Sequence, residues 1–256
     1  MSLVERSVND NVMTITLDDE ARRNALSEEL LGELTEAIGA ADDDPSVRIV
    51  IVTNHGSVFC AGANLRERSS PRASSDALSA LFLRIRNSPK IFVGRVAGHC
   101  VAGGVGLAAV LDISVAIDTA TFGFSEVRVG VAPAVISVVC LPKMRFAAAQ
   151  NAFLRGHRFG AEEAASVGLI TMSVPVDALD QFVRDIVNDL LAGEPHALAA
   201  TKQLLAAVPS LPLDDAFAWT SNLSNSLFAT DEAREGMAAF LEKRQASWVR
   251  RLPSGD

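Results

Sequence analysis

The sequence predicts an α/β protein whose C-terminal part is helical. Short, nearly all-apolar runs at 47–53 and 91–96 are typical of strands buried on both faces. Segments with helical spacing of apolar residues lie between such runs, and strand patterns nearly vanish after Ala134. The alternation indicates an α/β class, although the pattern alone fits a spiral of units and a doubly wound sheet equally well. We expect a body of residues 1–193 and a helical region of residues 194–256.

The chain begins with a β-hairpin, because apolar and polar residues alternate from Val4 to Asp18 around a polar turn. Ser27 is a typical helix N-cap, and apolar residues recur at helical spacing as far as Ala41. The stretch 66–76 is rich in Ser and Arg and is expected to form a mobile loop. The body is completed by predicted helices at 77–87 and 103–110 and by predicted strands at 113–116 and 121–124.

Helical patterns dominate the rest of the chain, where only 171–174 looks extended. The predicted helices cover 145–155, 161–167, 177–192, 196–207, 213–228 and 231–248. No low-complexity linker separates the helical region from the body, so we expect the two parts to be docked tightly.

Composition argues against several classes of function. The net charge is -8 and no Lys/Arg-rich run is present, so nucleic acid is not an expected partner. The apolar stretch 96–111 is shorter than the ~20 residues of a membrane-spanning helix and contains four glycines, so no membrane span is expected. The three cysteines lack paired or metal-ligand spacing, which indicates free thiols in a cytoplasmic protein without a metal.

Two glycine-bearing loops, 59–67 and 97–107, each follow a predicted strand. Glycine allows a backbone to approach a ligand closely, and a helix that starts in such a loop points free N–H groups at the ligand. Two such groups directed at one oxygen would stabilise a thioester enolate. Each loop taken singly also fits a tight turn that lets a strand and a helix pack.

A lone carboxylate, Glu126, lies between apolar runs in the segment 120–130. One interpretation is an exposed glutamate at the end of a strand. The other is a general base whose pKa is raised by removal from water. The residues alone leave both open.

Together, and in this order, the three pieces resemble the crotonase (enoyl-CoA hydratase/isomerase) superfamily. The segments 24–26 and 228–244 also resemble motifs of that family. The resemblance implies a crotonase-type spiral of ββα units followed by a helical C-terminal trimerisation region. It also implies a homotrimer or a dimer of trimers, and high apolar content (49%) is a second, weaker indication of surface buried between subunits.

The same resemblance implies the residues of the site. An acyl-CoA thioester would bind with its thioester oxygen held by the backbone N–H groups of Ala63 and Gly103, and Glu126 would be the catalytic carboxylate. The implied substrate-binding residues are Ala61, Asn64, Leu65, Arg66 and Gly104. Coenzyme A is part of the substrate, so no separate cofactor is expected.

One position departs from the family pattern. Family hydratases generally use two glutamates, and the first of these falls on Gly106. A hydratase that adds water across the C2=C3 bond of a 2-enoyl-CoA remains the first expectation. A Δ3,Δ2-enoyl-CoA isomerase with one glutamate base and a non-catalytic acyl-CoA-binding homologue are the alternatives. The segments 125–128 and 132–137 resemble a branch of hydratases linked to branched or glutaconyl-type enoyl-CoAs, and members of that branch also tend to carry Gly-Leu where Gly106 and Leu107 stand, which favours the hydratase.

Overall fold

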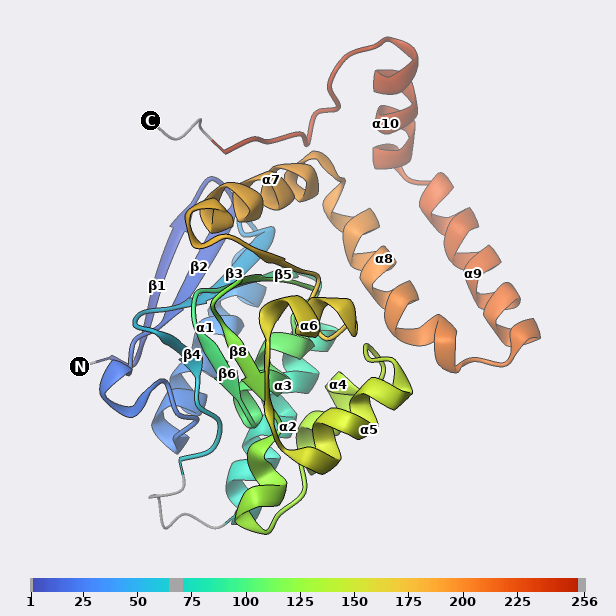
Figure 1. Cartoon of the computed structure of the whole chain (residues 1–256). Coiled ribbons are helices and arrows are strands. Elements are labelled where there is room, and N and C mark those ends of the chain that lie inside the picture. The colour runs from blue at the N-terminus through green and yellow to red at the C-terminus, as the bar shows by residue number, and fades with distance from the viewer. Residues whose placement is uncertain (1, 65–70, 253–256) are drawn as a thin grey trace.

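The computed structural model describes residues 2–64 and 71–252 and contains two β-sheets surrounded by helices, with a helical arm near the C-terminus (Figure 1). Within these residues the larger sheet has six strands, in the spatial order β1 (Val4–Asn9), β2 (Val12–Leu17), β3 (Ile49–Asn54), β5 (Ile91–Val96), β7 (Ile113–Ile117) and β10 (Met172–Val174). The smaller sheet has four, in the order β4 (Val58–Cys60), β6 (His99–Val101), β8 (Thr121–Gly123) and β9 (Arg158–Gly160).

Successive turns of the chain build both sheets at once. Each turn gives one strand to the larger sheet, the next strand to the smaller sheet, and then enters helical structure: β3, β4 and α2 (Pro71–Asn87), then β5, β6 and α3 (Gly103–Val110), then β7, β8 and α4 (Ala134–Cys140). Strands of neighbouring turns pair in parallel in both sheets. This arrangement confirms the expected spiral of ββα units and excludes a single doubly wound sheet.

The N-terminal elements also follow the sequence pattern. Strands β1 and β2 form the predicted antiparallel hairpin, with Val4 opposite Leu17. Helix α1 (Glu28–Asp43) begins at the predicted cap, where the Ser27 hydroxyl accepts a hydrogen bond of 3.1 Å from the Leu30 amide.

Several predicted elements differ from the structure. The expected loop at 66–76 is wrong from residue 71 onward, because α2 starts at Pro71, a residue whose fixed φ suits the first turn of a helix; residues 66–70 lie outside the described residues. The predicted helix at 231–248 is too long, because α10 (Asp231–Leu241) ends where Lys243 adopts a φ of +54°. Strands β4, β6 and β9 and helix α4 were not predicted.

The core lies between the sheets and the helices of the body. Its largest fully buried side chains include Phe59, Phe92, Phe122 and Phe124. A second apolar cluster covers the outer face of the larger sheet, where α7 (Leu179–Ala192) packs Val183 and Val187 against strands β3, β5 and β7. Helices α5 (Phe146–Arg155) and α6 (Ala161–Ser166) complete the body.

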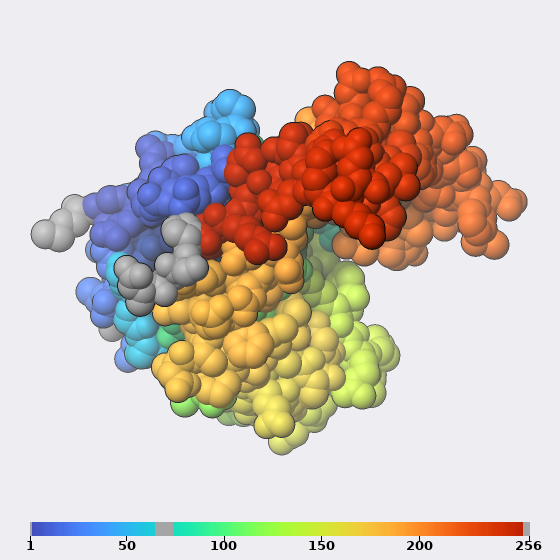
Figure 2. All heavy atoms as spheres, turned by 90° about the horizontal axis from the view of Figure 1, so that it is seen from above, coloured from blue at the N-terminus to red at the C-terminus, as the bar shows by residue number. Residues whose placement is uncertain are grey.

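The arm consists of α8 (Pro195–Ala207), α9 (Leu213–Phe228) and α10, and it stands out from the body (Figures 1 and 2). Helix α9 buries only Ala216 and helix α10 only Ala239. Large apolar side chains are left in water instead, among them Phe217 (65% exposed) and Phe240 (82% exposed). Such a surface is unusual for a monomer.

Two cationic side chains fix the base of the arm. The Lys202 ammonium, on α8, lies 2.9 Å from an oxygen of Asp112 and donates to the carbonyl oxygens of Ile85 (2.8 Å) and Lys90 (2.9 Å). The Arg48 guanidinium, just before β3, donates to two carbonyl oxygens at the two ends of the arm, those of Gly193 and Trp248. The chain therefore leaves the body and returns to it at one point.

Candidate active site

The two glycine-bearing loops meet at the N-terminus of α3. Gly62 has a φ of +82°, and a Cβ atom built there would lie 3.0 Å from the Gly103 nitrogen and 2.8 Å from the Val101 carbonyl oxygen. A Cβ atom at Gly103 would in turn lie 3.8 Å from the Ala63 nitrogen. The amides of Ala63 and Gly103 therefore lie close together, where the loops touch backbone to backbone.

Further contacts fix the separation of these loops. The Leu26 amide donates to the Gly62 carbonyl oxygen at 2.8 Å, which holds the first loop. In the second loop, a Cβ atom at Gly104 would lie only 2.1 Å from the Cys60 carbonyl oxygen, so no other residue fits there without moving the backbone. Ala102 adopts a φ of +50°, a conformation that costs an alanine energy and is found mostly where the fold or function requires it.

The amides of Ala63 and Gly103 are available to a ligand. Among the described residues, neither amide donates a backbone hydrogen bond, and Gly103 is the first residue of α3, where a helix has no internal acceptor for its N–H. Ala63 is exposed, so the site opens to solvent. Two free donors at a helix N-terminus can stabilise negative charge on one oxygen.

Glu126 lies in the 3-10 turn η2 (Ser125–Val129), directly after β8. The amides of Gly130 and Val131 both donate to its carbonyl oxygen, which fixes the backbone of the turn. The side chain is half-buried, and its Oε2 atom is buried without a hydrogen-bond partner among the described residues. Burial raises the pKa of Glu126 above its ordinary value. The structure therefore favours the buried carboxylate over the exposed strand end.

The charge of Glu126 is also felt on helix α4. Burial is the main cause of the raised pKa of the Cys140 thiol, and the charge of Glu126 raises that pKa further. Helices α3 and α4 contain no acidic residue, so Glu126 has no carboxylate neighbour on either helix. A half-buried carboxylate with one oxygen that has no hydrogen-bond partner is a group that can accept and return a proton.

The resemblance implies that family hydratases carry a glutamate at the position of Gly106, and here neighbouring side chains fill the space beside that glycine. A Cβ atom at Gly106 would lie 2.5 Å from Ile136 Cγ2 and 3.0 Å from Phe82 Cζ. Ile136, on α4, and Phe82, on α2, are both buried. Neither residue was among those expected from the sequence, and only their long-range contact with Gly106 reveals them.

The remaining expected site residues are placed less completely. The Ala61 amide donates to the Arg23 carbonyl oxygen at 3.1 Å, and Gly104 lies in the first turn of α3. Asn64 is partly buried beside Ala63. Leu65 and Arg66 lie outside the described residues, so their expected contacts with the CoA moiety stay predictions.

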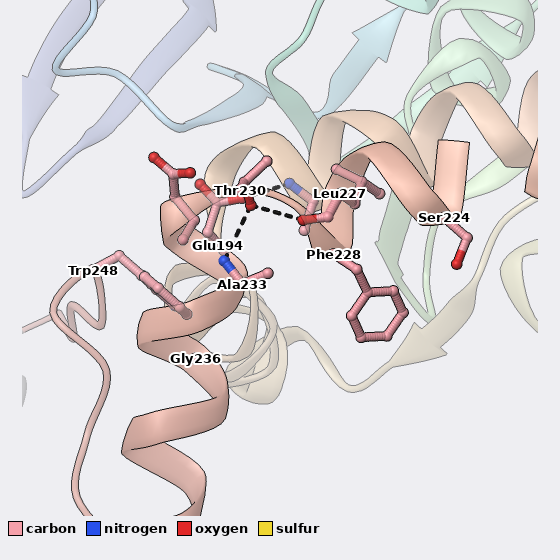
Figure 3. Close-up of a pocket in the computed structure, with 10 residues that line it drawn as sticks. Glu194, Ser224, Leu227, Phe228, Thr230, Ala233, Gly236 and Trp248 are labelled. Atoms are coloured by element: carbon pink, nitrogen blue, oxygen red, sulfur yellow. Dashed lines mark hydrogen bonds between the residues drawn. The ribbon is translucent and has the colours of Figure 1, made fainter. Parts of the chain in front are cut away.

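Two cavities lie away from this site. One, of about 270 Å³, lies at the base of the arm, where Figure 3 shows Trp248 beside Gly236 of α10 and Phe228 at the end of α9. The other, of about 600 Å³, lies between α8 and the C-terminal end of α3. Neither is lined by Glu126, Ala63 or Gly103. Within residues 2–64 and 71–252, no group of three or more potential metal ligands is found.

A ββα spiral with this loop arrangement has the crotonase fold, and solved structures share it across the chain. An enoyl-CoA hydratase from Mycobacterium smegmatis superposes with a TM-score of 0.92 at 30% identity, covering 97% of this chain and 99% of that one. Pseudomonas aeruginosa AtuE superposes with a TM-score of 0.92, also at 30% identity, covering 96% of this chain and 99% of that one.

Sequence comparisons agree with the fold. The family model for enoyl-CoA hydratase/isomerase matches residues 7–251. The chain is 30% identical to the enoyl-CoA hydratase EchA19 of Mycobacterium tuberculosis over 98% of this chain and 97% of that protein. It is 29% identical to the 2,3-dehydroadipyl-CoA hydratase of Escherichia coli, over 95% of this chain and 97% of that protein. The chain belongs to the enoyl-CoA hydratase/isomerase family, as its resemblance to the crotonases predicted.

Proposed function

We propose that the chain is an enoyl-CoA hydratase that adds water across the C2=C3 bond of a 2-enoyl-CoA thioester with Glu126 as its acid/base group. The observation that supports this most is the pairing of two features: adjacent free amides at Ala63 and Gly103, and a buried, unpartnered carboxylate oxygen on Glu126. Relatives named as hydratases at about 30% identity support the same choice.

The proposed reaction uses one carboxylate twice. Ionised Glu126 takes a proton from a water molecule as the water oxygen bonds to C3. The C2=C3 electron pair moves toward the thioester carbonyl, and the resulting enolate oxygen accepts hydrogen bonds from the Ala63 and Gly103 amides. Protonated Glu126 then delivers its proton to C2, which regenerates the carboxylate. Ala61, Asn64, Leu65, Arg66 and Gly104 are proposed to contact the substrate around these atoms.

The packing around Gly106 favours a second candidate, a Δ3,Δ2-enoyl-CoA isomerase. Moving a double bond requires one base that takes a proton from one carbon and returns it to another. Glu126 alone can perform both transfers, whereas Ile136 and Phe82 occupy the region that a side chain at residue 106 would enter. A branched or glutaconyl-type acyl group is proposed as the substrate class for the hydratase.

A parallel assay of two substrates separates the candidates. A hydratase removes the conjugated absorbance of a 2-enoyl-CoA, and an isomerase creates that absorbance from a 3-enoyl-CoA. We expect Glu126→Gln to lower kcat by at least about 10³-fold, because each acid/base transfer typically contributes 10²–10⁴. Glu162→Gln, an exposed glutamate on α6, is the matched control and should leave kcat unchanged.

The non-catalytic alternative has a different result in the same assay. It predicts that neither substrate turns over, while an acyl-CoA still binds with an affinity that Glu126→Gln does not change. That outcome would refute both enzymatic proposals.

The arm supports a proposed homotrimer or dimer of trimers. Its exposed phenylalanines, Phe217 and Phe240, would be removed from water by contact with another copy of the chain.

A cytoplasmic location is proposed from the three cysteines, Cys60, Cys100 and Cys140, which are all free and buried. Among the described residues, no helix has both the length and the apolarity needed to cross a membrane.

A further inference from the structure

The segment 24–26, to which the proposed reaction gives no role, lies against both glycine-bearing loops. The Leu26 amide donates to the Gly62 carbonyl oxygen at 2.8 Å, and Leu26 forms a parallel β-bridge with Ala63. On the second loop, a Cβ atom at Gly103 would lie 2.8 Å from Leu26 Cδ1. Leu26 is buried, so one core residue contacts both loops, the first through its backbone and the second through its side chain.

The backbone of Leu26 fixes the direction of the first oxyanion donor. The Gly62 carbonyl and the Ala63 N–H belong to one trans peptide group, in which they point in opposite directions. Because the Gly62 oxygen is directed at the Leu26 amide, the Ala63 N–H is directed away from Leu26. Rotation of this peptide group would break the hydrogen bond to Leu26. The same hydrogen bond polarises the Ala63 N–H, since linked hydrogen bonds strengthen one another.

The side chain of Leu26 fixes the place of the second donor. Its Cδ1 atom lies against Gly103, in the space that a Cβ atom of residue 103 would need. The same Cβ atom would lie 3.4 Å from Gly62 Cα and 3.8 Å from the Ala63 nitrogen, so the leucine and both loops meet at one point. Protein interiors are closely packed, and a shorter side chain at residue 26 would leave a void into which Gly103 can shift.

Asn24 holds Leu26 in this position. It is fully buried and adopts a φ of +51°. Its side-chain nitrogen donates to the carbonyl oxygens of Val58 (2.8 Å) and His55 (3.2 Å), and its side-chain oxygen accepts from the Asp19 amide (2.7 Å). Breaking such bonds would leave buried polar groups unpaired, which is costly. The Asn24 side chain therefore fastens the segment 24–26 to the turn from which the first loop starts.

We propose that Leu26 is a positioning residue for the two oxyanion donors: its amide orients the Ala63 N–H, its side chain sets the place of Gly103, and Asn24 holds it against both loops. The inference rests on the proposed function, because it assumes that the two amides bind the thioester oxygen. Leu26 acts through these donors and does not itself touch the reacting atoms. Its truncation should therefore weaken catalysis more than it weakens substrate binding.

The first test shortens the Leu26 side chain. We expect Leu26→Ala to lower kcat on the enoyl-CoA that the wild type turns over by at least about 10-fold, because a misplacement of ~1 Å can cost about 10²-fold. KM should change little. Leu26→Met, which has a similar volume, should keep kcat near that of the wild type. The matched control is Leu34→Ala, a fully buried leucine of α1, which should lose stability but not kcat.

A spectroscopic measurement separates positioning from a general loss of structure. The ligand is a saturated thioester, butyryl-CoA, with an isotope-labelled carbonyl, and the readout is the infrared stretching frequency of that carbonyl. We expect binding to the wild type to lower the frequency, because the two amides polarise the carbonyl. At saturating protein, Leu26→Ala should lower it less, whereas Leu34→Ala should match the wild type.

A second variant tests the anchor and serves if Leu26→Ala folds poorly. Asn24→Asp keeps the shape of the side chain but directs an oxygen at the carbonyl oxygens of Val58 and His55. We expect a lower kcat and a smaller infrared shift. The matched control is Asn11→Asp, which should change neither. Asn11 also has a positive φ (+68°) and donates to a carbonyl oxygen (2.7 Å), but it lies in the turn between β1 and β2.

Failure of the inference is distinguishable from failure of the proposed function. A wild type that turns over no enoyl-CoA and leaves the carbonyl frequency of butyryl-CoA unchanged would show that the proposed function is wrong. A wild type that does both, with Leu26→Ala and Asn24→Asp variants that match their controls in kcat and in infrared shift, would overturn the inference alone. A Leu26→Ala variant whose KM rises while kcat stays constant would also overturn it, because Leu26 would then contact the substrate.

Discussion

Gly62→Ala is the most direct test of the two-amide arrangement, because backbone N–H groups cannot be removed by changing a side chain. At a φ of +82°, an alanine costs about 1–2 kcal/mol relative to its preferred conformations. Its Cβ atom would also lie 2.8 Å from the Val101 carbonyl oxygen and 3.0 Å from the Gly103 nitrogen. Both of these are backbone atoms, so relief of the clash requires the two loops to move apart.

The expected magnitudes follow from these two effects. The conformational cost alone lowers the melting temperature by roughly 2–8 °C for a chain of this size. Separation of the loops moves the Ala63 and Gly103 amides away from one another, and loss of one oxyanion donor typically lowers kcat by about 10²–10³-fold. We therefore expect a large loss of kcat together with a moderate loss of stability.

Steady-state kinetics on a 2-enoyl-CoA and a thermal melt measure the two effects separately. Gly130→Ala is the stability control: Gly130 has a φ of +83°, but a Cβ atom there meets nothing within 4 Å. It should show the conformational cost without the clash. A Gly62→Ala enzyme that loses no more stability than Gly130→Ala and retains its kcat would refute the convergence of the two amides.

Two further predictions concern stability and assembly. Because burial raises the pKa of Glu126, its ionised form destabilises the folded chain at neutral pH, and this cost vanishes as the pH falls below the ordinary value of 4.5. Glu126→Gln should therefore raise the free energy of unfolding at pH 7, with no gain near pH 4; equal gains at both pH values in denaturant titrations would contradict this. Phe217→Glu with Phe240→Glu should yield monomers in sedimentation velocity, whereas Phe182→Glu, on α7, should not. A wild type that sediments as a monomer would contradict the second prediction.

The sequence predicted most of the body because its signals are local. Ser27 caps α1 as expected, and the apolar runs around residues 49–54 and 91–96 form central strands of the larger sheet. Strands β4 and β6 overlap the segments 59–67 and 97–107, which were interpreted as glycine-bearing loops, and β9 has only three residues. These strands form because the spiral brings segments from different turns of the chain side by side, and this long-range pairing cannot be predicted from any one segment.

The candidate site was predicted to a similar degree. Ala63, Gly103 and Glu126 were expected from the joint resemblance of three segments to the crotonases, and the structure brings the two amides together and half-buries the carboxylate. The packing of Ile136 against Gly106 was not predicted, because Ile136 lies 30 positions further along the chain and belongs to a helix that was not predicted. The sequence of this helix, α4, is AVISVVC, which is rich in β-branched residues of low helix propensity.

Because Arg48 holds both ends of the arm on the body, a cut within the arm and a truncation of the C-terminus should affect the chain differently. One guanidinium binds the carbonyl oxygens of Gly193 and Trp248, and the tail beyond it continues along α7, where the Leu252 amide donates to the Asn188 side chain at 2.8 Å. A single proteolytic cut at the far end of the arm, between α8 and α9, would thus leave two fragments that are each still fastened to the body. A deletion of only the last nine residues, 248–256, would instead remove the contacts of Trp248 and Leu252 that hold the C-terminal end of the arm on the body.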